Sequence, residues 1–222
     1  MNATEQILAA PAATKLAKSV QAQVAVAFEH YGGMLAASAN GFGLPAEAAA
    51  RNLFDLVVGT LYLIENQHLV DDFIEFGQLT FYHLMRDVGE LPQYQQSRAR
   101  DLARYDAEVG RLEGKFKGKN VWHGRQVRQI ATDVGMGALY ATAYKPASAI
   151  IHGSSYPILN RNDGPEWVIA FERQRWDRYV KGSPVYGYLM LRVFYAEVFR
   201  LFQIADTTHL GEMDEVCARF SK

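Results

Sequence analysis

Apolar residues recur at spacings of three and four along most of the chain, and this periodicity predicts helices rather than strands. The sequence contains no alternation of strand-like and helix-like segments. It also contains no internal repeat and no low-complexity segment. We therefore expect an all-α fold, an irregular bundle of roughly six to eight helices. Helical patterns cover residues 14–39, 45–66, 69–88, 93–113, 138–151, 186–205 and 211–220. Residues 166–180 fit either a helix or a minor short β element.

The segment from Pro45 to Asn66 differs from the others because its apolar residues occupy nearly every face. Proline suits the first helical turn, so the helix is expected to begin at Pro45. Between Leu53 and Ile64 almost every residue is apolar. A helix that is hydrophobic all round is buried on all sides. This segment is therefore predicted to be the central helix of the bundle.

Two prolines predict local features of later helices. Pro146 lies inside the pattern of residues 138–151, where it removes one backbone hydrogen bond and is expected to bend or restart the helix just ahead of Ser148. Ser183 followed by Pro184 has the form of a helix start, because a capping residue precedes a first-turn proline. The last long helix is therefore predicted to begin there.

The composition is that of an ordinary globular protein, and it excludes several classes. The 222 residues are 49% hydrophobic and 21% charged, with no compositional break, which predicts a single domain over residues 1–222. A formal net charge of −1 excludes a strongly basic protein. Any nucleic-acid binding would therefore need a local basic patch.

Cysteine usage and the apolar runs indicate a cytoplasmic protein. Cys217 is the single cysteine, which excludes an internal disulfide framework and a cysteine-rich zinc site. Residues 1–10 include Glu5 and no basic segment before an apolar core, so no secretory signal peptide is expected. Of the two longest apolar runs, residues 53–64 are too short to span a membrane and residues 186–204 are interrupted by charges. We expect no membrane association.

Polar side chains line one side of a predicted later helix. Tyr144, Ser148 and His152 stand four residues apart, so a helix would place them on one face. Arg51 and Asp55, also four residues apart, bring charge into the apolar central helix. A charge that enters a core helix must be paired or hydrogen-bonded. We therefore predict that the two helices pack together and that these five residues form one network.

A glycine-rich basic stretch with interleaved aromatic residues covers residues 114–125, and Arg128 follows it on a predicted short helix. Cations beside rings that stack on bases are what proteins offer to single-stranded nucleic acid. The candidate RNA-binding residues are Lys115, Lys117, Lys119, Trp122, His123, Arg125 and Arg128. The alternative is an exposed loop that its lysines keep soluble while the Trp122 ring fills the core.

Metal and cofactor chemistry is not indicated. The sequence contains no His-Glu-x-x-His motif and no paired acidic cluster. Ser148 and His152 have helical spacing, but no nucleophile elbow or oxyanion-hole motif accompanies them. We therefore expect neither a bound metal nor a cofactor.

Two short motifs carry a resemblance to a known family. They are Arg51-Asn-Leu-Phe-Asp55 and Ser148-Ala-Ile-Ile-His152-Gly153. Over roughly residues 45–155 the sequence resembles a bacterial domain family of unknown function. Its members carry an Arg followed four residues later by an acid, and then a Ser-x-x-x-His followed by a small residue. That family is in turn distantly similar to the HEPN helical domains, several of which are metal-independent ribonucleases of toxin and phage-defence systems.

The resemblance implies a chemistry for these residues. A His would move a proton at the ribose 2′-hydroxyl or at the leaving oxygen, while a fixed cation stabilises the phosphorane charge. In this sequence His152 would be the acid or base and Arg51 the cation, oriented by Asp55. HEPN nucleases place their Arg and His on one helix, whereas the residues shortly before His152 include Lys145 and no arginine.

Three interpretations stay open at this point. The first is an HEPN-like RNA-acting protein, an endoribonuclease of the defence or toxin type, that uses His152, Arg51 and the basic stretch. The second is a structural or interaction module in which the polar network fixes helix register without catalysis. The third is a helical pocket that binds a small anionic ligand through Arg51 and His152. The apolar face of residues 186–205 is expected to support a homodimer.

Overall fold

The computed structural model describes residues 3–88, 108–151, 177–205 and 208–220. Every regular element in these ranges is a helix, which confirms the all-α fold class. Of the segment expected to be either helix or strand, only the part from Asp177 onward is described, and it is helical.

The chain folds as two compact units. Unit 1 comprises Met1–Glu65 and Val127–Lys222, and unit 2 comprises Asn66–Gln126. Each unit has its own helices and its own apolar cluster. The expectation of a single domain over residues 1–222 stays a prediction.

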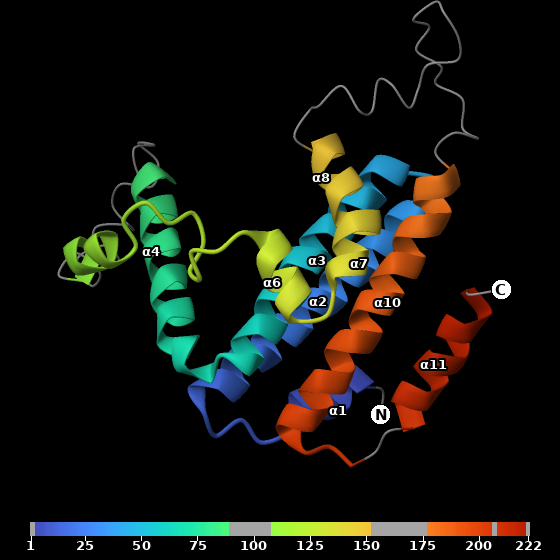
Figure 1. Cartoon of the computed structure of the whole chain (residues 1–222), viewed down its shortest axis with the longest axis horizontal. Helices are drawn as coiled ribbons and strands as arrows, with labels where there is room; N and C mark the ends of the chain where they lie inside the picture. Colours follow the sequence, from blue (N-terminus) through green and yellow to red (C-terminus); the bar gives the residue numbers. More distant parts are fainter. Residues whose placement is uncertain (1–2, 89–107, 152–176, 206–207, 221–222) are drawn as a thin grey trace, which may run out of the picture. The chain divides into compact units, whose positions relative to one another are not determined.

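Three long helices form the core of unit 1, and they are α2 (Lys15–Ala39), α3 (Gly43–Glu65) and α10 (Asp177–Phe202). The three helices pack side by side (Figure 1). Most residues of α3 from Leu53 onward are buried, and the Phe54 side chain is fully buried. The prediction of a central helix is confirmed, because α3 packs against both other long helices.

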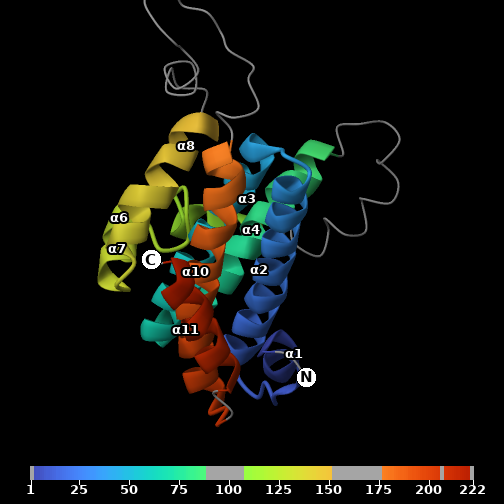
Figure 2. The same cartoon turned by 90° about the vertical axis from the view of Figure 1, so that its right-hand side faces the viewer.

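Shorter helices cover this three-helix core. α1 (Ala3–Ala9) packs on α2 and α10, and α11 (Thr208–Phe220) lies along α10 (Figure 2). α6 (Val127–Asp133), α7 (Gly137–Leu139) and α8 (Lys145–Ile151) follow one another along the chain. Both α6 and α8 pack on α3. The central helix therefore contacts segments from the first half and the second half of the chain.

Two buried hydrogen bonds join helices that are far apart in the sequence. The Ser183 hydroxyl donates to a carboxylate oxygen of Glu47 across 2.6 Å and links α10 to α3. The hydroxyl oxygens of Thr4 and Tyr195 lie 2.9 Å apart and link α1 to α10. All four residues are buried. Their hydrogen bonds satisfy polar groups that would otherwise destabilise the core.

The prediction that the last long helix begins at Ser183 is wrong. α10 begins at Asp177 and passes through Pro184. A proline inside a helix removes one backbone donor and crowds the preceding turn. The Ser183 hydroxyl, which would cap a helix start, donates to Glu47 instead. A buried tertiary contact thus takes the place of the local capping motif.

The ends of α2 agree with the local sequence. Thr14 caps the first turn, because its hydroxyl oxygen accepts a hydrogen bond from the Ala17 amide at 3.0 Å. At the other end Gly41 has a φ of 77°, and the Phe42 amide donates to the Ala37 carbonyl across 2.8 Å. This is a Schellman motif, which glycine favours because it needs a positive φ.

Unit 2 contains η1 (Gln67–Leu69), α4 (Val70–Val88) and a helix described over residues 108–115. Its apolar cluster is small. The buried members are Leu79, Leu112 and Phe116, with Phe76 packed against them. Unit 2 therefore depends more on its polar contacts than unit 1 does.

Charged residues interrupt the apolar run of α10. Arg192 and Arg200 both lie within α10. Among the described residues, no helix carries an apolar run long enough to cross a membrane.

Candidate functional site

Arg51 and Asp55 of α3 lie beside Tyr144, the last residue of a π-helical segment (Tyr140–Tyr144) that joins α7 to α8. A guanidinium nitrogen of Arg51 is 3.1 Å from a carboxylate oxygen of Asp55. The central guanidinium carbon lies 5.6 Å from the centre of the Tyr144 ring. The expected packing of these helical segments is confirmed. Three of the five predicted network residues meet here.

The Arg51–Asp55 pair is partly exposed, with 23% and 30% of the two side chains accessible. Burial raises the pKa of the Tyr144 phenol, the Asp55 carboxylate raises it further, and Arg51 opposes the shift. Tyr144 therefore stays protonated at neutral pH and offers a hydroxyl beside both charges. The Nε–H of Arg51 is buried and has no acceptor among the described residues.

The remaining two network residues lie further along the same helical line. Ser148 is on α8, one turn beyond Tyr144, and is half-buried. α8 is described up to Ile151, so His152 lies outside the described residues. The part of His152 in the network stays a prediction.

The π-helical segment widens the helix just before Pro146. The Lys145 amide donates to the Tyr140 carbonyl five residues back, instead of the usual four. Proline has no amide hydrogen, and its ring crowds the carbonyl four residues earlier. A widened turn ahead of Pro146 relieves that crowding. The irregularity expected at this proline therefore takes the form of a π turn, which is frequent at functional sites.

A tight turn brings α6 back alongside the π-helical segment. Gly135 has a φ of 75°, which strains most other residues. The Met136 amide donates to the Ala131 carbonyl at 2.7 Å, and the Gly135 amide donates to the Thr132 carbonyl at 3.2 Å. These two bonds end α6 in a Schellman motif. The chain reverses direction within this turn.

The reversal leaves a hollow of about 420 Å³ between α6 and the start of α8. Its lining residues are Arg128, Thr132, Gly137, Tyr140, Ala141 and Lys145. The side chains of Arg128 and Lys145 are exposed, and neither has an ion pair or hydrogen bond in the part of the chain that the structure describes. Two cations with no counter-charge among the described residues, placed at one cavity, suit an anionic group.

Tyr140 connects this hollow to the Arg51–Asp55 pair. Its ring stacks on the Tyr144 ring with the centres 5.3 Å apart, and Phe54 of α3 contacts both rings. Stacked rings in a packed core hold a fixed spacing between their two ends. The sequence patterns did not single out Tyr140 as a site residue. The available signal was its position four residues before Tyr144, which extends the polar line by one turn.

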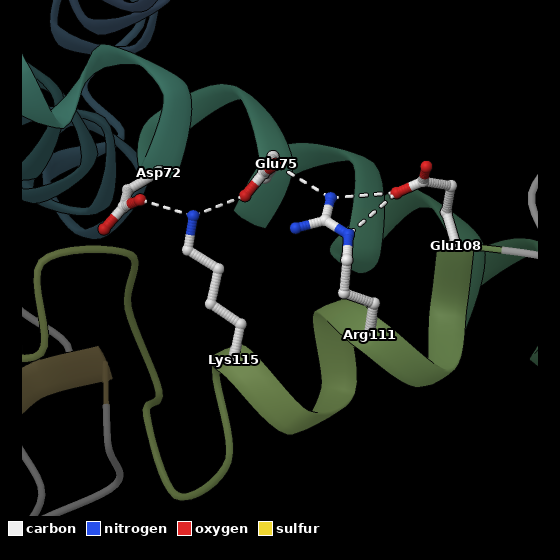
Figure 3. Close-up of polar contacts among 5 residues, drawn as sticks. All are labelled: Asp72, Glu75, Glu108, Arg111 and Lys115. Atoms are coloured by element: carbon white, nitrogen blue, oxygen red, sulfur yellow. Dashed lines mark hydrogen bonds and ion pairs between the residues drawn. The ribbon is translucent and has the colours of Figure 1, made fainter.

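In unit 2, acids bind the first cation of the predicted RNA-binding stretch (Figure 3). Lys115 Nζ lies 2.6 Å from an oxygen of Asp72 and 2.5 Å from an oxygen of Glu75. An Arg111 nitrogen lies 2.8 Å from oxygens of both Glu75 and Glu108. Hydrogen bonds to Asp72 and Glu75 raise the pKa of Lys115. The charge of Lys115 is therefore already compensated inside unit 2.

Trp122 and His123 make packing and backbone contacts within unit 2. Trp122 is half-buried, and its ring meets Phe73 of α4 edge-on with the centres 5.5 Å apart. His123 Nδ1 accepts the Arg125 amide hydrogen at 3.1 Å, and burial lowers the pKa of His123. The Trp122 contact agrees with the interpretation in which its ring fills an apolar core.

The remaining basic residues of the predicted RNA-binding set are exposed, and they do not all belong to one unit. Lys117, Lys119 and Arg125 are exposed in unit 2, with Lys119 Nζ 5.5 Å from the centre of the Phe116 ring. Arg128 lies in unit 1, where it lines the hollow. The predicted RNA-binding residues are therefore divided between the two units.

The site in unit 1 gathers cations, hydroxyls and rings. Among the residues that the structure describes, no group of three or more His, Cys, Asp or Glu side chains is arranged to hold a metal ion. Guanidinium, ammonium and phenol groups are hydrogen-bond donors suited to anions.

Comparison of the chain with known proteins places it in a family. No curated protein and no solved structure matches it. A family model does match, over residues 21–166, and it is that of the family of unknown function DUF5677. The matched range contains the Arg51–Asp55 pair, His152 and all residues that line the hollow. Because the match covers well over half of the sequence, the chain belongs to this family of unknown function, DUF5677.

Proposed function

We propose that the protein binds RNA through unit 1 and that a backbone phosphate occupies the hollow lined by Arg128 and Lys145. The observation that carries this proposal is a pair of exposed cations at one cavity, with no acidic partner among the described residues. A phosphodiester spreads one negative charge over two oxygens. Cations on two walls of a cavity can each contact one of these oxygens.

Further groups at the hollow favour RNA over a simple inorganic anion. Tyr140 lines the cavity and can offer a ring edge and a hydroxyl. The Thr132 hydroxyl donates to the Arg128 carbonyl at 3.0 Å, so its oxygen is free to accept a hydrogen bond from a ribose 2′-hydroxyl. Proteins that bind single-stranded RNA combine cations for phosphates with rings and hydroxyls for the nucleosides.

The proposal extends to RNA cleavage at the Arg51 end of the site. In metal-free cleavage the 2′-oxygen attacks phosphorus, its proton passes to a base, and the 5′-oxygen leaves as it gains a proton. His152 would serve as the base or acid, and Arg51 would stabilise the charge that develops on the phosphorane. Support comes from the setting of Arg51, which is partly exposed and held by Asp55. The Tyr140–Tyr144 stack joins this end to the hollow.

Binding can be tested by fluorescence anisotropy with a labelled single-stranded RNA of mixed sequence. The double variant Arg128→Gln/Lys145→Gln should lose at least about tenfold in affinity, because two phosphate contacts disappear. Lys18→Gln is the matched control, since Lys18 is an exposed lysine of unit 1 on α2. Equal affinities for the double variant and the wild type, or an equal loss in the Lys18→Gln control, would refute binding at the hollow.

Cleavage can be tested by incubating the protein with the same RNA in EDTA, beside the variants His152→Ala and Arg51→Ala. Circular dichroism should first show that both variants are folded. Loss of cleavage in both folded variants supports the nuclease proposal. RNA that is bound but not cut by the wild type refutes cleavage and leaves binding intact. No binding, together with earlier melting of both variants, supports the structural-network interpretation instead.

A further inference from the structure

One side of α2, left exposed by the helices packed on it, carries a regular apolar repeat. Ala25, Phe28, Gly32, Leu35 and Ala39 follow one another at spacings of three and four residues. This is the repeat that aligns residues in one seam along a helix. Phe28 is 51% exposed and Leu35 is 42% exposed. A single exposed apolar residue is ordinary, but a continuous seam of them indicates an interaction surface.

Large and small side chains alternate along this seam. Phe28 and Leu35 are large, whereas Gly32 and Ala39 are small and exposed. Two surfaces interlock when large side chains of one meet small side chains of the other. When two α2 helices pair antiparallel about the middle of the seam, Phe28 faces Ala39 of the partner subunit and Leu35 faces Gly32 of the partner subunit. The seam is therefore complementary to itself.

We propose that the protein forms an antiparallel homodimer through this α2 seam. A second copy is the fitting occupant because a two-fold interface requires one surface that complements itself. The charge pattern agrees with this, since no charged residue occurs from Tyr31 to Phe42. The centre of the pairing therefore brings no like charges together, which would oppose association.

The seam differs from the apolar face of residues 186–205 on which a homodimer was expected. In unit 1 that face is already covered, because its central residues lie in the core. They are Leu191, Tyr195, Val198 and Phe199. Dimerisation through α2 leaves this core undisturbed.

The length of the seam sets the expected strength of the dimer. From Ala25 to Ala39 the helix rises about 21 Å. A single helix pair of this length buries less than the roughly 800 Å² per partner of a typical stable interface. We therefore expect a dimer that dissociates in the micromolar range.

Sedimentation velocity of the full chain across about 1–100 μM should show a monomer–dimer equilibrium. Leu35→Glu should raise the dissociation constant by about a hundredfold or more, because a carboxylate would be buried in the seam. Val26→Glu is the matched control on the opposite side of α2, where Val26 is 39% exposed, and it should leave the equilibrium unchanged. A wild-type monomer throughout this range, or a dimer that survives Leu35→Glu, overturns the proposal.

Disulfide trapping tests the antiparallel register, with the native thiol removed by Cys217→Ala. A mixture of Phe28→Cys and Ala39→Cys chains should form a mixed disulfide dimer, because these positions face each other. Either chain alone should stay uncrosslinked, since two copies of position 28 would lie about 16 Å apart. Efficient crosslinking of Phe28→Cys with itself would indicate a parallel pair and refute the register.

Discussion

In unit 2, acids bind Arg111 and Lys115, whereas in unit 1 Arg128 and Lys145 line a hollow that no described acid lines. In the sequence Arg111, Lys115 and Arg128 all stand in or beside the basic stretch, and of these four cations only Lys145 lies apart from it. The carboxylate that binds both Arg111 and Lys115 belongs to Glu75, at least 36 positions earlier. A basic stretch therefore indicates free positive charge only when the acids that fold against it are known.

The two units also differ in what stabilises them. Unit 1 buries three long helices and carries hydrogen bonds such as Ser183–Glu47 inside its core. Unit 2 combines a small apolar cluster with largely exposed ion pairs. Buried apolar surface contributes about 25 cal/mol per Å², whereas an exposed ion pair contributes at most about 1 kcal/mol. We expect unit 2 to open more readily than unit 1.

The largest effect is expected from truncating the buried ring that supports the site. Phe54→Ala should lower the free energy of unfolding by about 3–5 kcal/mol, because Phe54 is fully buried and contacts Tyr140 and Tyr144.

Phe116→Ala is the corresponding variant in unit 2, because Phe116 is buried in the apolar cluster of that unit. It should remove hydrogen-exchange protection from α4 and residues 108–115 while α3 stays protected. Urea unfolding measures the first effect and hydrogen exchange the second. Equal loss of protection in both units after Phe116→Ala would contradict the expected difference in stability between unit 1 and unit 2.

A smaller loss of stability is expected at Gly187, where α10 lies against Met34 and Tyr31 of α2. A Cβ added at Gly187 would lie 2.0 Å from the terminal carbon of Met34 and 3.0 Å from the Tyr31 ring. Met34 is fully buried and has little room to move, so Gly187→Ala should destabilise by about 1–3 kcal/mol. Gly182→Ala, in the same helix, meets only an ordinary contact at 3.7 Å and should be neutral or stabilising. Thermal melting of both variants measures the difference. Similar melting temperatures for Gly187→Ala and Gly182→Ala would contradict the close packing at Gly187.

The difference between Lys145, which lines the hollow of unit 1, and Lys115, which acids bind in unit 2, can be tested by the salt dependence of RNA binding. Lys145→Gln should reduce the slope of log affinity against log salt by about one, because one phosphate contact is lost. Lys115→Gln should change the slope less, since Asp72 and Glu75 already compensate Lys115. Anisotropy titrations at several salt concentrations measure both slopes. A larger change for Lys115→Gln would place the RNA on unit 2.

The smallest effect is expected from the ion pairs of unit 2. Hydrogen bonds from Arg111 and then Lys115 lower the pKa of Glu75 from its ordinary 4.5. A lowered carboxyl pKa stabilises the folded state above the ordinary value, and this contribution is lost as the pH falls through the folded pKa. Glu75→Gln should therefore lower the free energy of unfolding by no more than about 1 kcal/mol at pH 7, and this loss should shrink as the pH falls through the folded pKa of Glu75. Hydrogen exchange of α4 at pH 7 and pH 3 measures this loss in the wild type and the variant. If the difference in α4 protection between the two proteins is the same at both pH values, the prediction is contradicted.

Much of the fold could be predicted because its signals are local. The all-round apolar pattern of α3 identified the central helix, and the helical pattern of residues 14–39 agrees with α2 to within one residue. The pairing of α3 with the segment around Tyr144 followed from the cost of an unpaired charge in a core helix. Each of these inferences depends on residues a few positions apart, or on a requirement that holds in any packed core.

The charge state of the surface and the shape of the site were settled by contacts between distant segments. Ser183 is a helix cap by its local sequence, but the buried Glu47 carboxylate accepts its hydrogen bond. Lys115 stands in a basic stretch, but α4 supplies the acids that bind it. The hollow exists because the turn at Gly135 sets α6 against the start of α8. Periodicity and capping act over one or two turns, whereas these features depend on which helices pack together in space.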